Sequence, residues 1–255
     1  MFQSNTCKYC IVSLFALFFI THVSIAAEES LIGYWTFDEN GDVAKDLSGN
    51  GNDGKISGSQ KRVAGVKGQA LDFDKAKKTY VEVLDNKSLD ITDAITIEAW
   101  INPKSIYIGN DWKQRNSVLG KATAYYLDIT EQGNLASYLY GVQPEQWLVG
   151  KADMRKLINE WVHVAAVYDG KEHAVYINGE KDAGVAKKGQ IRSVDRHLEM
   201  GWVDNDRYFD GLIDEVKLWG RALSKDELKA SATLAVEPLD KLPITWGKMK
   251  SMRRQ

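Results

Sequence analysis

The sequence predicts an all-β protein, a sandwich or a barrel of antiparallel strands. Its regular segments are short runs rich in β-branched and aromatic residues, and Gly, Asn and Asp turn signals separate them at fairly even spacing. Such runs are too short for helices. Many short strands without intervening helices are typical of sandwiches and barrels.

The strands are expected, in chain order, at residues 31–37, 69–73, 80–83, 94–101, 117–119, 124–129, 135–140, 161–168, 172–177, 198–200 and 209–219. In 94–101, apolar residues alternate with Thr96, Glu98 and Trp100, which predicts one face toward the core and one away from it. The run 161–168 is apolar at both alternating positions and is therefore expected to be a central strand covered on both sides.

Local signals connect several of these elements. Asp169-Gly170 and Asn178-Gly179 suit turns that need positive φ, so 161–177 and the following residues are expected to form a three-strand meander. Ser224 and Glu227 form a capping box ahead of residues 228–230, which predicts a brief helix.

The amino terminus has the pattern of a secretory signal peptide, assigned to residues 1–27. A short polar start with Lys8 precedes the apolar run 11–20, and small residues close the segment at Ala26-Ala27. The alternative is an uncleaved anchor, but the run is shorter than the roughly 20 residues that span a bilayer. We therefore expect a secreted, extracellular or cell-surface protein with no transmembrane segment in the mature chain.

The two cysteines, Cys7 and Cys10, both lie in the predicted signal peptide, so the mature domain is expected to lack disulfides. Residues 28–232 are expected to form one domain, and 233–255 an extended tail with a basic end, which is disordered, a surface anchor or a docking peptide. The net charge is −2 and the charges alternate in sign along the chain, which argues against nucleic acid as a partner.

Four groups of motifs stand in order between residues 31 and 230. They are GYWTFDE at 33–39 with DLSGNGNDG at 46–54, then GVKGQALDFD at 65–74 with ITIEAWI at 95–101, then WVHVA at 161–165 with YDG at 168–170 and YING at 176–179, and finally FDGLIDEVKLW at 209–219 ahead of RALS at 221–224. Together they resemble the laminin-G-like jelly-roll domains of the concanavalin A-like lectin and glucanase superfamily. The resemblance implies two antiparallel sheets in a jelly roll.

Acidic residues around a Gly/Asn-rich loop are compatible with a calcium site, although their spacing alone does not establish one. Asp38, Asp46 and Asp53 surround this loop, whose glycines allow carbonyl groups to turn inward, and calcium takes six to eight oxygen ligands. The loop lacks EF-hand spacing. The resemblance implies one structural Ca²⁺ held by Asp38, by Asn50 or Asn52, and by Asp214 of the last strand.

Asp214 supports this assignment independently. It stands beside Glu215 in an apolar run, and strict alternation would point one of the two carboxylates inward, where an unpartnered charge costs several kcal/mol. The alternative partners are Arg221, Lys217 or the amides of a loop.

Catalysis is not expected. Related glucanases place two carboxylates two residues apart on one strand, so that both face the same way. Here Asp214 and Glu215 are adjacent and Glu98 stands alone, whereas Asp204-Asn205-Asp206 lies in a polar, loop-like stretch. His163 is expected in the core, and His173 and His197 at strand edges or on the surface.

Aromatic and polar side chains that suit a ligand platform gather in and after the segment 107–140. The candidates are Trp112, Arg115, Tyr140, Trp147 and Trp202, with Trp112 in the most polar surroundings. For each ring, packing in the sandwich is the alternative. We expect a lectin-like module that binds a glycan, or else a protein-interaction or adhesion domain that binds an extracellular protein in a surface assembly; a glycoside hydrolase is the less favoured alternative.

Overall fold

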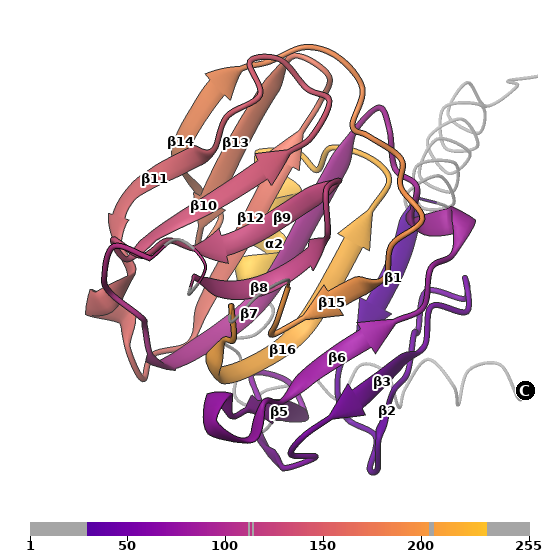
Figure 1. Ribbon diagram of the computed structural model, residues 1–255, viewed down its shortest axis with the longest axis vertical. Coiled ribbons are helices and arrows are strands. Elements are labelled where there is room, and N and C mark those ends of the chain that lie inside the picture. The colour runs from indigo at the N-terminus through magenta and orange to yellow at the C-terminus, as the bar shows by residue number, and fades with distance from the viewer. Residues whose placement is uncertain (1–29, 112, 114, 204–206, 234–255) are drawn as a thin grey trace, which may run out of the picture.

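The computed structural model describes residues 30–111, 113, 115–203 and 207–233, and it confirms the predicted all-β sandwich. Two antiparallel sheets of eight strands each make up the domain (Figure 1). We call the sheet at the front of Figure 1 the front sheet and the other the back sheet. The predicted signal peptide and all but the first residue of the predicted tail lie outside the described residues.

The back sheet has the strand order β14-β13-β12-β7-β16-β5-β4, and β1 pairs with β16. Its strands are β1 (Leu31–Trp35), β4 (Arg62–Ala64), β5 (Gln69–Phe73), β7 (Ile95–Ser105), β12 (Val162–Tyr168), β13 (Glu172–Ile177), β14 (Glu180–Ala186) and β16 (Asp210–Trp219).

The front sheet has the order β11-β10-β9-β8-β15-β6-β3-β2. Its strands are β2 (Val43–Ala44), β3 (Gly54–Ser57), β6 (Tyr80–Val83), β8 (Asn116–Lys121), β9 (Tyr125–Ile129), β10 (Asn134–Leu139), β11 (Leu148–Asp153) and β15 (Leu198–Met200). The sequence did not predict β2, β3, β4 and β11, which are very short or only partly buried.

The helical elements are short. They are the 3₁₀ helices η1 (Lys75–Lys77), η2 (Lys87–Leu89) and η4 (Met154–Leu157), and the α-helix α2 (Lys225–Thr233). The predicted capping box is present: Ser224 N donates to Glu227 Oε2 at 2.8 Å, and Glu227 N donates to Ser224 Oγ at 3.3 Å. In the described part of the chain, no helix is long and apolar enough to cross a membrane.

The core lies between the two sheets. Alternate residues of β7 enter it, and β12 is buried along its whole length between β13 and β7, as the apolar patterns predict. The turn from β13 to β14 has positive φ at Asn178 (50°) and Gly179 (74°), which confirms the predicted meander.

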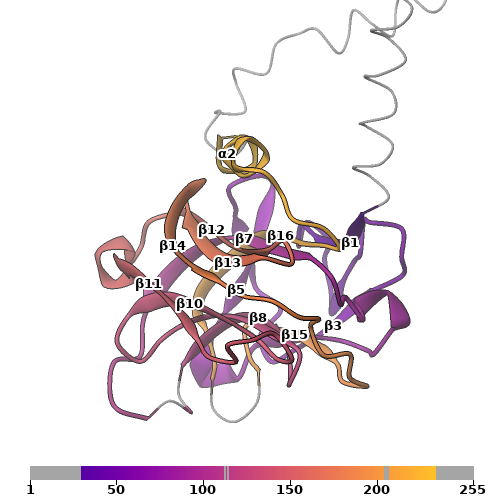
Figure 2. The same ribbon diagram turned by 90° about the horizontal axis from the view of Figure 1, so that it is seen from above.

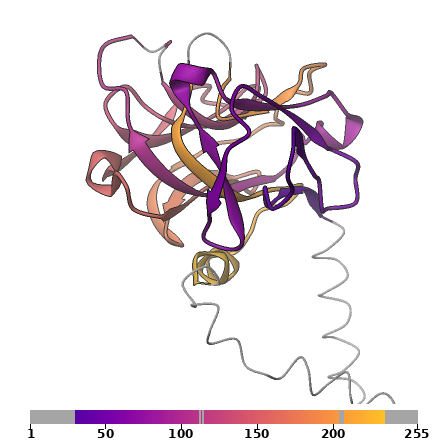
Figure 3. The same ribbon diagram turned by 90° about the horizontal axis from the view of Figure 1, so that it is seen from below.

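Helix α2 covers the outer face of the back sheet. Figures 2 and 3 show it outside the layer that contains β12, β7 and β16, on the side away from the front sheet. Leu228 of the helix packs with Ala165 and Val167 of β12 in a small apolar cluster of its own. Helix α2 therefore leaves the outer face of the front sheet uncovered.

Candidate functional site

The first candidate site begins with the Gly/Asn-rich loop, which Asp46 organises. The Asp46 carboxylate accepts hydrogen bonds from the backbone N–H groups of Tyr34, Ser48 and Asn52 and from the Ser48 hydroxyl, at 2.8–3.0 Å. The side-chain amides of Asn50 and Asn52 donate to the Ile32 carbonyl at 3.2 and 2.8 Å. These contacts fasten the loop to β1 and use both asparagine side chains there.

Asp38 and Asp214 meet at a different loop, Gly65–Gln69. Gln69 N donates to Asp38 Oδ1 at 2.7 Å, whereas Val66 N and Lys67 N donate to Asp214 Oδ2 at 2.8 and 3.1 Å. The approach is close enough to require glycine, because a Cβ would lie 2.4 Å from Asp214 Oδ2 at Gly65 and 2.1 Å from Asp38 Oδ1 at Gly68. The loop thus joins the end of the first strand to the last strand.

A bulge in β16 shapes this corner. Glu215 has φ of 49°, and the pairing with β7 shifts between Asp214 and Lys217, so that Ile213 and Val216 both enter the core. The expected strict alternation is therefore wrong here: Asp214 and Glu215 are both buried. Glu215 Oε2 accepts a hydrogen bond of 2.7 Å from the Tyr34 hydroxyl.

Burial raises the pKa of Asp214 to about 7, although the amides of Lys67, Glu215 and Val66 act in the opposite direction. The two cations offered as alternative partners are engaged elsewhere, since Lys217 Nζ lies 3.8 Å from Glu98 and Arg221 pairs with Glu227 at 2.7 Å. Of the alternative partners considered for Asp214, the structure shows the backbone amides of a loop.

The donor set fits a calcium ion in part. Asp38 and Asp214 share one glycine-containing loop, and Glu39 Oε2 and Glu215 Oε1 are buried without a hydrogen bond. Within the described ranges, no three His, Cys, Asp or Glu side chains converge on one point that could hold a metal ion. The amides of Asn50 and Asn52 bind β1 instead, so a cation at the Gly65–Gln69 loop would need backbone carbonyl oxygens and water as further ligands.

The second candidate site is a cluster of aromatic side chains on the outer face of the front sheet. It consists of Tyr126, Tyr138, Tyr140 and Trp147, which we call the aromatic face. Tyr126 of β9 and Tyr138 of β10 are cross-strand neighbours, and their positions alternate with residues that enter the core. The other two rings come from the segment between β10 and β11. The cluster is therefore separate from the core of the sandwich.

The rings of the aromatic face touch one another. Tyr138 lies 4.6 Å from Tyr140 and 5.1 Å from Trp147 between ring centroids, and Tyr126 lies 6.0 Å from Trp147. These separations are in the range of favourable aromatic pairs. Tyr126 is buried, whereas the other three rings are half-buried and so retain accessible surface.

Charged groups underlie one end of the aromatic face. The Arg115 guanidinium lies 4.1 Å from the Trp147 ring centroid, and its Nε donates to Glu131 Oε2 at 2.7 Å. Asp128 is fully buried nearby, with Arg207 Nη1 at 3.8 Å and no hydrogen bond to either carboxylate oxygen. Burial raises the pKa of Asp128 to about 6, and Arg207 only partly offsets this effect.

Three of the five predicted ligand residues come together on or beside the aromatic face: Arg115, Tyr140 and Trp147. Trp202 stands in another aromatic group, 5.1 Å from Tyr80 and 6.0 Å from Tyr208. Trp112 lies outside the described residues.

Sequence reasoning did not single out Tyr126, which comes next to the core residue Tyr125. Residues two apart on a strand point to the same face of a sheet, so the spacing of Tyr138 and Tyr140 was the one indication in the sequence that their rings lie together.

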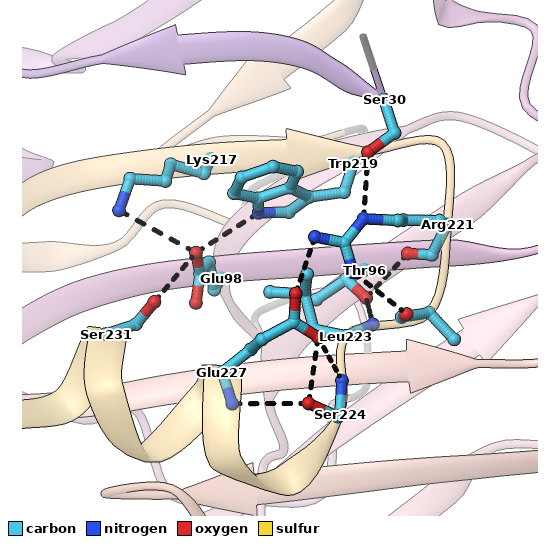
Figure 4. A network of polar contacts seen from close by, with 11 residues as sticks. Ser30, Thr96, Glu98, Lys217, Trp219, Arg221, Leu223, Ser224, Glu227 and Ser231 are labelled. Carbon is cyan, nitrogen blue, oxygen red and sulfur yellow. Dashed lines mark hydrogen bonds and ion pairs between the residues drawn. The ribbon is translucent and has the colours of Figure 1, made fainter. Parts of the chain in front are cut away.

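Glu98 lies on the opposite side of the molecule, under helix α2. Its carboxylate accepts hydrogen bonds from His163 Nε2 and Trp219 Nε1, both at 3.1 Å, and from the Ser231 hydroxyl at 3.3 Å. Figure 4 shows how this network ties the helix to the back sheet. His163 is buried as predicted.

The position predicted for His173 was wrong, because this side chain is also buried. Its Nε2 lies 2.9 Å from Ser137 Oγ of the front sheet, so a polar partner across the sandwich accommodates it in the core.

A family model described as the concanavalin A-like lectin/glucanases superfamily matches residues 75–229. The chain belongs to this superfamily. No curated protein is recognisably similar to it in sequence.

Solved structures that resemble the chain share the fold of the superfamily. The binding domain of Paraclostridial Mosquitocidal Protein 1 has a TM-score of 0.64 at 17% identity, over 81% of this chain and 52% of that chain. Domain 4 of AbnA, an extracellular arabinanase from Geobacillus stearothermophilus solved with arabinotriose, has 0.61 at 20% identity, over 80% and 98%. Botulinum neurotoxin type C has 0.62 at 13% identity, over 84% and 53%. The chain therefore spans about half of the toxin chains and nearly all of the arabinanase domain.

Proposed function

We propose that the chain is a non-catalytic carbohydrate-binding module whose ligand lies on the aromatic face. The observation that carries this proposal is the joining of Tyr126, Tyr138, Tyr140 and Trp147 into one cluster outside the core, with three rings half-buried. Sugars stack their apolar C–H faces on such rings, and nearby polar groups receive their hydroxyls.

Two structural neighbours support a sugar ligand. Domain 4 of the arabinanase was solved with arabinotriose, and cell entry of botulinum neurotoxin type C depends on two ganglioside molecules. The placement of two acidic residues, Glu98 and Asp214, supports a non-catalytic role, since Glu98 is enclosed beneath α2 and Asp214 is held by loop amides. Neither carboxylate lies beside the aromatic face.

We further propose that the domain is exported and that one structural Ca²⁺ binds at the Gly65–Gln69 loop. Asp38 and Asp214 would hold the ion, together with carbonyl oxygens of the loop. The ion would act only through its charge and would join the end of β1 to β16. Such a link would stabilise a domain whose predicted mature part has no cysteine and so no disulfide bond.

The proposal is tested with a panel of immobilised polysaccharides probed with the wild type and with Trp147→Ala and Tyr140→Ala. Tyr176→Ala is the matched control, because Tyr176 is a half-buried ring packed near α2 on the back sheet. We expect saturable binding that falls at least about tenfold in both variants of the aromatic face and persists in the control, provided that circular dichroism shows all four folded.

A variant Trp202→Ala shows whether the second aromatic group contributes to the same ligand. An extracellular protein partner is the alternative outcome. This alternative is favoured if the wild type binds no member of the panel but binds an extracellular protein, and if Trp147→Ala and Tyr140→Ala weaken that binding. Loss of binding only in Tyr176→Ala would refute the assignment of the face.

A further inference from the structure

The segment 187–192 lies directly against the hairpin that carries the aromatic face. Gln143 and Lys188 exchange two backbone hydrogen bonds of 2.8 and 2.9 Å, and Arg192 N donates to the Tyr140 carbonyl at 2.9 Å. These bonds fix the side chains of 187–192 beside the rings of Tyr138 and Tyr140.

This segment brings cations to the rings. The Arg192 guanidinium lies 5.2 Å from the Tyr140 ring centroid, and Lys187 Nζ lies 5.9 Å from that of Tyr138. Lys187 is buried and donates to the Gln146 carbonyl at 2.7 Å, whereas Lys188 is exposed. Two positive charges, those of Arg192 and Lys187, therefore border the half-buried part of the aromatic face.

Carboxylates neutralise this border only weakly. Glu145 lies 3.8 Å from Arg192 Nη2, too far for a hydrogen bond, and the Arg192 side chain is 49% exposed. In the part of the chain that the structure describes, no ion pair joins Lys187 or Lys188 to a carboxylate. Arg115, in contrast, already has Glu131 as a close partner. Arg192 is thus the cation of the aromatic face that is best placed to receive an anion from outside.

We infer that the aromatic face takes acidic glycans, with Arg192 bound to a carboxylate or sulfate group of a sugar that stacks on Tyr140. This inference rests on the proposed function. An exposed guanidinium beside a ring offers a planar fork for an anionic group while the ring receives the apolar face of the sugar.

The test uses a uronic acid oligosaccharide, the same oligosaccharide with its carboxyl groups reduced, and a sulfated neutral oligosaccharide, each titrated by calorimetry. We expect the reduced form to bind at least about tenfold more weakly than the uronic acid form, and Arg192→Gln to abolish the difference. The control Lys229→Gln, on α2 beside Glu180, removes a charge from the other side of the molecule and should change nothing. The sulfated arm distinguishes a general anion site from one for carboxylates.

Equal affinity for the acidic and reduced forms, or a preference that survives Arg192→Gln, would overturn this inference alone, because stacking on Trp147 and Tyr140 would remain intact. If none of the three ligands binds and no member of the polysaccharide panel does so either, the proposed function fails with it.

Discussion

Asp38 and Asp214, from the beginning and the end of the domain, accept hydrogen bonds from the same loop, Gly65–Gln69. The bonds come from the backbone of Gln69 to Asp38 and from Val66 and Lys67 to Asp214. A single peptide loop thereby connects the first strand with the last. Two carboxylates on one loop repel each other, and the N–H donors of the loop offset part of this repulsion.

We predict that calcium stabilises the domain through this loop. At a concentration about a hundred times Kd, one site contributes about 2.7 kcal/mol, which corresponds to roughly 5–10 °C in Tm for a domain of this size. Differential scanning calorimetry with calcium and with a chelator measures the shift. Asp38→Asn and Asp214→Asn should remove it.

Asp53→Asn and Asn50→Ala are the controls for this experiment, since both residues belong to the Gly/Asn-rich loop that Asp46 organises. They should lower Tm without reducing the calcium-dependent shift. A wild-type Tm that is the same with calcium and with chelator contradicts the calcium proposal, and a shift lost only in Asn50→Ala would move the ion to the other loop.

We predict an unusual dependence of stability on pH from Asp128. Its pKa of about 6 in the folded protein exceeds the value of about 3.9 in an unfolded chain, so the folded state retains a proton that the unfolded state releases. The associated stability is fully present below about pH 4 and is lost as the pH rises through 6. Asp128→Asn removes the effect.

Urea unfolding at pH 4 and pH 7.5 measures this dependence. Relative to Asp128→Asn, the wild type should lose about 2–3 kcal/mol of unfolding free energy between the two pH values. The exposed Asp195, changed to Asn, serves as control and should follow the wild type. Parallel profiles for the wild type and Asp128→Asn would contradict this prediction, because they would show that folding does not raise the pKa of Asp128.

We predict that Glu98 has a structural role only. Burial opposes its ionisation, but the hydrogen bond from His163 and the charge of Lys217 outweigh this and lower the pKa of Glu98. Glu98→Gln should therefore cost about 1–3 kcal/mol at neutral pH, and the difference should fade as the pH falls through the lowered pKa. Glycan affinity of the folded variant should equal that of the wild type.

Chemical denaturation and ligand titration of Glu98→Gln provide the two readouts. Glu172→Gln is the control, because it breaks an exposed ion pair with Lys181 whose contribution should be below about 1 kcal/mol. Reduced ligand affinity in folded Glu98→Gln would refute the purely structural role.

The sequence was sufficient where local pattern determines structure. Alternation predicted the orientation of β7, and the Asn178-Gly179 dipeptide predicted a turn, which has the expected positive φ. The capping box at Ser224 predicted the start of α2. The sequence failed where an element departs from regularity, as at Glu215, whose left-handed backbone creates the bulge in β16.

The candidate binding face was only partly predictable because it depends on pairing between distant segments. Nothing near Tyr140 in the sequence indicates that Arg192 lies over its ring, or that Tyr126 is the neighbour of Tyr138 across two strands. His173 lies in the core, where Ser137 faces it from the other sheet. Such contacts follow from the register of the strands.

A nuclear magnetic resonance titration tests the aromatic face most directly. An oligosaccharide that binds is added to the protein, and the indole N–H signals of Trp147 and Trp219 are followed. Trp147 belongs to that face, and Trp219 lies on the back sheet with its indole bound to Glu98. Progressive movement of the Trp147 signal with an unchanged Trp219 signal is the predicted result. Movement of Trp219, with Trp147 unaffected at saturation, would contradict it.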